Sequence, residues 1–160
     1  MEPDFRALQV LAEVSLGIVG FSAILIGLSR SKNGFSRPDN FRIQLLTFSA
    51  FGAMFCALLP FAIFNQNNID LSWTIVNWTL CLYSTIGLLI FPRRVFDLRR
   101  EGYKDLFPFK IVLLQVGILI TIFILSGSMI LGFIEQKNNF YLFCLILFVV
   151  QSTVAFIRTM

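Results

Sequence analysis

The sequence predicts an all-α integral membrane protein with five transmembrane helices. The first observation behind this prediction is composition: 57% of the 160 residues are hydrophobic and only 14% are charged. A soluble domain carries about 25% charged residues, which keep its surface in water. A chain this apolar, with a mean hydropathy of +0.81, is not typical of a cytosolic enzyme, a disordered regulator or a soluble nucleic-acid binder.

The second observation is a series of apolar stretches, each close to the roughly 20 residues that a membrane-spanning helix needs. We predict spans at residues 5–28, 43–64, 71–91, 111–134 and 140–157. The connections between them are short, so residues 1–160 are expected to form a single transmembrane domain. The start of the chain lacks the basic region and cleavage site of a signal peptide, and we expect the first span to be retained.

The third observation is the uneven distribution of basic residues between the connecting segments. Two segments hold most of them, namely Arg30, Lys32, Arg37 and Arg42 in the first, and Arg93, Arg94, Arg99, Arg100, Lys104 and Lys110 in the other. The two remaining connections contain Lys137 alone. The positive-inside rule therefore places the N-terminus outside and the C-terminus inside the cell.

The segment between the third and fourth spans is long for a connection. Pro92 suits the first turn of a helix, and Pro108 would end one. Between them, apolar residues such as Val95 and Phe96 are interspersed with basic residues. On a helix this pattern would give one apolar face and one basic face. We predict a short amphipathic helix here, lying in the cytoplasmic interface of the membrane.

The inventory of reactive side chains argues against an enzyme. The chain has no histidine, which removes the usual general base near neutral pH and histidine-based zinc sites. Cys56, Cys81 and Cys144 each lie inside a predicted span, where cysteine commonly packs between helices. No glycine-rich phosphate loop or nucleophile elbow is present. We therefore expect no enzymatic activity, no cofactor and no metal site.

The first span has two faces that are poorly suited to lipid. At 100° per residue, one face collects Glu13, Gly17, Gly20, Ile24 and Gly27, and the opposite face collects Ser15, Ser22 and Ser29. Glycine lets another helix approach closely, and serine finds hydrogen-bond partners in neighbouring helices or water. We expect this helix to be packed on both sides, with the serine stripe lining a water-filled path.

Glu13 is the only carboxylate placed clearly within a predicted span. An acidic or basic side chain at the centre of a membrane helix costs about 2.5–3.5 kcal/mol on insertion scales, so such residues are usually functional. Three interpretations remain open for Glu13. It is a protonated packing residue, part of an ion path or gate, or a carboxylate that couples transport to protons.

Two primary amides add to the candidate pore-lining or gating residues. Asn77 lies in the third predicted span and Gln115 in the fourth. A primary amide in hydrocarbon requires hydrogen-bond partners, so both join Glu13 and the three serines of the first span. The other small and hydroxyl residues in the spans are expected to serve helix packing.

Five helices from one chain are too few to enclose a wide hydrated path, whereas several subunits around an axis enclose one readily. We therefore favour a homo-oligomeric channel lined by the first span. Two alternatives stay open, a small proton-coupled transporter that uses Glu13 and a non-transporting accessory membrane subunit. The odd number of spans, without matching halves, is not typical of an inverted-repeat transporter.

The basic residues that face the cytoplasm are the candidate contacts for an anionic partner. The candidates are Arg30, Lys32, Arg37, Arg42, Arg93, Arg94, Arg99 and Arg100. Anionic lipid headgroups of the bilayer are one such partner. A cytoplasmic polyanion is the other, and its binding would weaken steeply with salt.

Three stretches of the sequence carry a resemblance to known proteins. They are the run from Leu11 to Ile24, which begins Leu-Ala-Glu and ends Gly-Phe-Ser-Ala-Ile, the Ala57 to Pro60 element, and the stretch from Arg93 to Gly102. Together they resemble small multi-span bacterial membrane proteins, and the chain is similar to the transmembrane channel effector of the Hailong anti-phage defence system. The resemblance implies a tetrameric channel in the bacterial inner membrane that is held closed by short DNA oligomers, with the cytoplasmic arginines as contacts.

Overall fold

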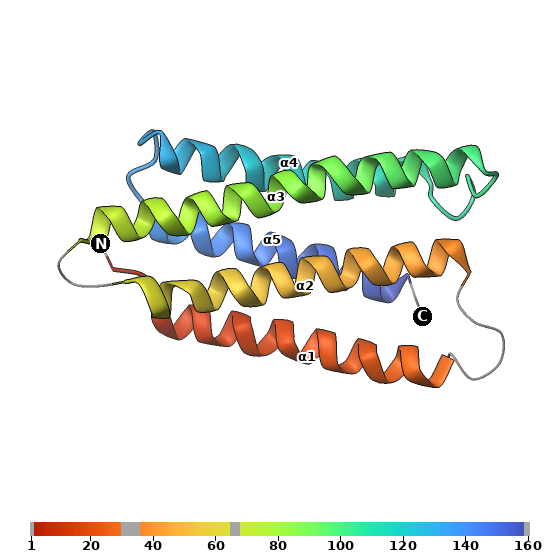
Figure 1. Ribbon diagram of the computed structural model, residues 1–160, viewed down its shortest axis with the longest axis horizontal. Coiled ribbons are helices and arrows are strands. Elements are labelled where there is room, and N and C mark those ends of the chain that lie inside the picture. The colour runs from red at the N-terminus through yellow and green to blue at the C-terminus, as the bar shows by residue number, and fades with distance from the viewer. Residues whose placement is uncertain (1, 30–35, 65–67, 159–160) are drawn as a thin grey trace.

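The computed structural model describes residues 2–29, 36–64 and 68–158. Within these ranges the chain is all-helical (Figure 1), with α1 Phe5–Ser29, α2 Arg37–Ile63, α3 Ile69–Arg100, α4 Phe109–Ile130 and α5 Lys137–Ile157. Each of these helices is long and apolar enough to cross a membrane. The predicted multi-pass membrane fold is confirmed at this level.

Successive helices run in alternating directions, which gives the bundle two distinct ends (Figure 1). One end, here called the basic end, holds the last turns of α1, α3 and α5 and the first turns of α2 and α4. Its basic residues are Arg37, Arg42, Arg93, Arg94, Arg99, Arg100, Lys104, Lys110 and Arg158. Arg30 and Lys32, which were predicted with them, lie outside the described residues.

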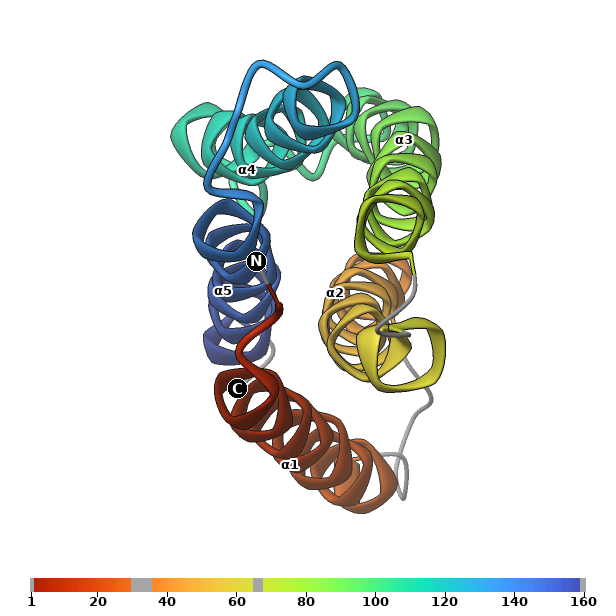
Figure 2. The same cartoon turned by 90° about the vertical axis from the view of Figure 1, so that its left-hand side faces the viewer.

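The helices form an elongated bundle with α1 at its edge. α2 packs against α1, α3 and α5, and α4 packs against α3 and α5. Figure 2 shows α3 and α4 at one end of the cross-section and α1 at the other, where it contacts α2 and α5. A large part of the surface of α1 is therefore left without a neighbour in the single chain.

The separate interfacial helix predicted from Pro92 to Lys110 is absent from the structure. Instead, α3 continues through Pro92 to Arg100, and its 32 residues span about 48 Å, well beyond the roughly 30 Å hydrocarbon core. Proline removes one backbone donor and its ring crowds the carbonyl four residues earlier, but the added turns bury Val95 and Leu98 in the bundle. That burial favours continuing the helix. Gly102, with a φ of +104°, follows its end.

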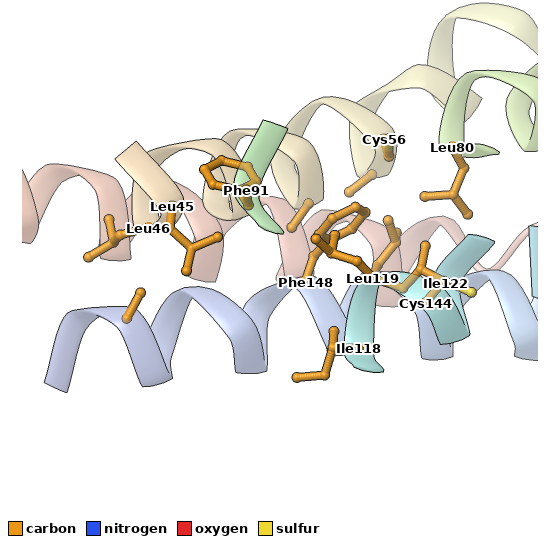
Figure 3. Close-up of a cluster of buried hydrophobic side chains, with 14 of the residues drawn as sticks. Leu45, Leu46, Cys56, Leu80, Phe91, Ile118, Leu119, Ile122, Cys144 and Phe148 are labelled. Atoms are coloured by element: carbon orange, nitrogen blue, oxygen red, sulfur yellow. The ribbon is translucent and has the colours of Figure 1, made fainter. Parts of the chain in front are cut away.

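The centre of the bundle is filled with apolar side chains from α2 to α5 (Figure 3). Leu80, Leu119, Ile122 and Phe148 are buried there from three different helices. A core filled with apolar side chains is not typical of a water-filled path through the described part of one chain.

The start of α1 is fixed against the end of the bundle opposite the basic end. The backbone N–H of Asp4 donates to Oδ1 of Asn138 at 2.9 Å. The ring of Phe5 lies 5.0 Å from the ring of Phe61, measured between centroids. These contacts tie the first residues of α1 to α2 and α5, and so determine which face of α1 turns inward.

Candidate functional site

The inner face of α1 carries the predicted serines. Ser15 and Ser22, seven positions apart, are 0% and 4% exposed. Their hydroxyls donate to the carbonyls of Leu11 and Ile18, at 2.7 and 2.5 Å. Both serines therefore face the bundle of their own chain and are satisfied by their own helix backbone. The side chain of Ser29 lies outside the described residues.

The outer face of α1 is the surface formed by Glu13, Gly17, Gly20, Ile24 and Gly27, all of which are exposed. Glu13 Oε1 accepts a hydrogen bond from Gln9 Nε2, one turn earlier, at 2.9 Å. No cation of residues 2–29, 36–64 and 68–158 forms an ion pair with it. The one carboxylate that lies deep in a span thus faces away from the bundle.

The glycines of the outer face are not required by packing within the chain. A Cβ added at Gly17, Gly20 or Gly27 would meet no atom within 4 Å. By contrast, a Cβ at Gly52 in α2 would lie 2.3 Å from Cε1 of Tyr83. Each glycine in a helix interior costs about 1 kcal/mol relative to alanine, so packing explains Gly52 but leaves the three glycines of α1 unexplained.

The predicted amides lie elsewhere, inside the bundle. Asn77 is 1% exposed, and neither its amide nitrogen nor its amide oxygen has a hydrogen-bond partner. Gln115 on α4 is 7% exposed. It lines a small cavity together with Gln151 on α5, a residue that was not among the predicted site residues. The structure therefore does not bring Asn77 or Gln115 next to Glu13.

At the basic end, three arginines from three helices converge on the connection between α3 and α4. We call Arg42, Arg99 and Arg158 the arginine cluster. Arg42 Nη2 donates to the carbonyl of Leu106 at 3.3 Å, and Arg158 donates to the same carbonyl. Arg99 donates to the carbonyl of Phe107. The cluster holds this connection against the bundle.

The buried ring of Phe107 is the apolar part of the same arrangement. The guanidinium carbons of Arg42 and Arg158 lie 5.5 and 5.7 Å from its centroid, within range of a cation–π interaction. Arg158 was not among the predicted site residues, because a single arginine after an apolar span gives no sign that its side chain contacts residues 106–107.

The arginine cluster carries more positive than negative charge. Asp39 Oδ1 lies 3.5 Å from Arg42 Nη1 and is the one carboxylate in the described ranges that forms an ion pair with the cluster. Burial and the neighbouring positive charge of Arg42 lower the pKa of Arg158. The guanidinium groups of Arg42 and Arg158 thus share the Phe107 ring and the Leu106 carbonyl. Asp39 neutralises only part of their positive charge.

The other predicted basic residues lie around the cluster. Arg37 pairs with Glu101 at 2.9 Å, and Arg94 donates to the side chain of Gln44. Arg93 is exposed. Arg100 lines an open pocket of about 560 Å³ with Arg99, Phe96 and Lys104. The basic end therefore carries several positively charged side chains, some of them exposed.

Among the described residues, no three histidine, cysteine, aspartate or glutamate side chains group together as metal ligands would. Comparison with known proteins gave no match to a family model, to a curated protein or to a solved structure.

Proposed function

We propose that the protein is a homo-oligomeric membrane channel whose subunits meet through the outer face of α1. The observation that carries the proposal is the position of Glu13. It lies about 12 Å along the helix from Phe5, at 1.5 Å per residue, and its side chain is uncovered in the single chain. A charged group at such a depth is costly in lipid, and a second copy of the chain would remove it from lipid.

The pattern of small residues supports a helix-to-helix contact on this face. Gly17, Gly20, Ile24 and Gly27 follow one another at intervals of three and four positions, the spacing of a continuous packing seam. Small residues let membrane helices approach closely. Since no contact within the chain requires these glycines, a neighbouring α1 helix would account for them.

A pathway between subunits is favoured because the interior of the bundle is filled. Copies of α1 arranged around an axis would place Glu13 and Gln9 from each subunit in a ring. An ionised acidic ring favours cations. We propose a tetramer, in agreement with the resemblance to the Hailong channel effector. In this arrangement the outer face of α1 lines the ion path, whereas the sequence had suggested that the serine face would line it.

We further propose that the basic end faces the cytoplasm of a bacterium and binds an anionic ligand such as an oligonucleotide, which controls the pore. The positive-inside rule supports the orientation. The arginine cluster supports the ligand class because its charge is only partly neutralised. Its contacts with residues 106–107 would link the ligand to α2, α3 and α5. A role as a pore-forming effector of anti-phage defence follows from the resemblance.

Cation flux from liposomes containing the purified protein tests the channel. Gly20→Leu should abolish most of the flux, because the added side chain separates neighbouring α1 helices. Glu13→Gln should reduce it several-fold by removing the charge of the ring. The control is Ile120→Leu on the exposed face of α4, which should leave flux unchanged. Equal flux in all variants, or none in the correctly inserted wild type, would contradict the proposal.

Proton-coupled transport is the second candidate, and it is favoured by the same deep carboxylate bonded to Gln9. In that case flux would require a pH gradient, and Glu13→Gln would abolish it completely. An accessory subunit would show neither behaviour and would purify as a monomer or with a different membrane protein. Measuring flux with and without a pH gradient separates these alternatives from a channel.

Binding of a short single-stranded oligonucleotide to the detergent-purified protein tests the ligand. Affinity should fall steeply with salt, since phosphate contacts release counterions. Arg42→Gln and Arg158→Gln should each weaken it at least several-fold, whereas Arg6→Gln at the opposite end should not. Absence of binding at low salt would reject the oligonucleotide as ligand while leaving the channel proposal intact.

A further inference from the structure

A small cavity lies where four helices meet, in the half of the bundle nearer the basic end. Its volume is about 10 Å³. Apolar side chains from α2, α3 and α4 form most of its wall, among them Phe41, Phe91 and Leu119. Gln115 from α4 and Gln151 from α5 also line it. Two amides, one from each of two helices, thus line the same cavity in an otherwise apolar core.

Gln151 is unsatisfied at this point. Its side chain is 0% exposed, and neither Oε1 nor Nε2 has a hydrogen-bond partner. Buried polar groups in folded proteins almost always have a partner in the protein or in ordered water. An unpaired amide is especially unfavourable in an apolar environment that bulk water does not reach. Unlike Asn77, Gln151 lines a cavity, so there is space beside it for a further hydrogen-bonding group.

The cavity has the size and the chemistry for one water molecule. A site of about 10–15 Å³ holds a single water, provided that two or more polar groups surround it. Gln115 and Gln151 together offer two amide oxygens and two amide nitrogens. The residues that line the cavity carry no charge, and a metal cation such as calcium takes six to eight oxygen ligands. The cavity is also too small for an organic molecule.

We propose that one water molecule occupies this cavity and hydrogen-bonds to both Gln115 and Gln151. The water acts as an acceptor for one amide N–H and as a donor to an amide carbonyl. It joins α4 to α5 within the apolar core. This site is independent of the outer face of α1 and of the arginine cluster.

A structure determined at a resolution that shows ordered water tests the site. We expect a density peak at hydrogen-bond distance, about 2.7–3.2 Å, from the side chains of both Gln115 and Gln151. In Gln151→Met, which has a similar volume and no hydrogen-bonding amide, the peak should be lost. The control is Asn77→Leu, which removes a different unpartnered amide and should leave the peak in place.

Two results would overturn the proposal. One is a direct hydrogen bond between Gln115 and Gln151 with no density between them. The other is a peak that persists in Gln151→Met, because a water held without Gln151 would not satisfy its amide. If that variant does not fold, the wild-type map alone decides, since it shows either the bridging water or an empty or closed cavity.

Discussion

The hydroxyl of Tyr141 on α5 donates a hydrogen bond to the backbone carbonyl of Cys56 on α2, with 2.5 Å between the two oxygens. That carbonyl lies four residues before Pro60. In an uninterrupted α-helix its donor would be the N–H of residue 60, which proline lacks. Tyr141 therefore supplies the hydrogen bond that Pro60 removes, and a proline is accommodated in the last turn of α2.

Tyr141→Phe should lower the free energy of unfolding by about 1–3 kcal/mol, because it leaves a buried carbonyl without a donor. The measurement is thermal or chemical denaturation in detergent micelles. In a Pro60→Ala background the same substitution should cost less, since the alanine restores the backbone N–H. An equal loss in both backgrounds would show that the tyrosine does not compensate for the proline.

Gly52→Ala should destabilise the contact between α2 and α3. The added Cβ would lie 2.3 Å from Cε1 of Tyr83. The Tyr83 ring cannot easily move, because it stacks on Phe48 at 4.3 Å and its hydroxyl donates to the Phe48 carbonyl at 2.7 Å. Overpacking of this kind costs about 1–3 kcal/mol, measurable as a lowered unfolding temperature.

Gly127→Ala in α4 is the matched control for this substitution, because a Cβ there meets no atom within 4 Å. It should leave stability unchanged or raise it slightly through helix propensity. If both alanine variants behave alike, the close approach of α2 and α3 at Gly52 is wrong.

Asn77→Leu should raise the free energy of unfolding. Both amide atoms of Asn77 are buried without a partner, and replacing an unpaired amide by an apolar side chain of similar size removes a burial cost of about 1–3 kcal/mol. Thermal unfolding is again the measurement. Asn138→Leu is the contrast, because Asn138 accepts a hydrogen bond from Asp4, and its replacement should be destabilising. Loss of stability in Asn77→Leu would mean that the amide is hydrogen-bonded in the membrane.

The positions of the five helices follow from the sequence because membrane insertion depends on local hydropathy over about 20 residues. The continuation of α3 past Pro92 does not follow from it. Judged locally, a proline is expected at the start or the end of a helix. In α3, the burial of Val95 and Leu98 against other helices outweighs this local preference. The sequence of this segment alone does not show whether the local cost of proline or the gain from burial against other helices is larger.

The two faces of α1 were recognised from periodicity alone, but their directions were not. Ser15 and Ser22 turn toward the chain's own bundle, and Glu13 turns away from it. Periodicity defines which residues share a face and does not say which neighbour each face meets. The packing of Arg42 and Arg158 against the Phe107 ring could not be predicted from the sequence either. It brings together α2, the residue that follows α5 and the connection between α3 and α4, which are far apart in the sequence.

Disulfide cross-linking through the outer face of α1 tests the central claim most directly. Gly17→Cys is made in a Cys81→Ala background, while Cys56 and Cys144 are buried and stay in place. Ile120→Cys, on the exposed face of α4, is the control at a similar depth. Oxidation in native membranes should link two chains through position 17 and none through position 120. A Gly17→Cys protein that remains monomeric after oxidation, and that also has the mass of one chain in native mass spectrometry, would contradict the account.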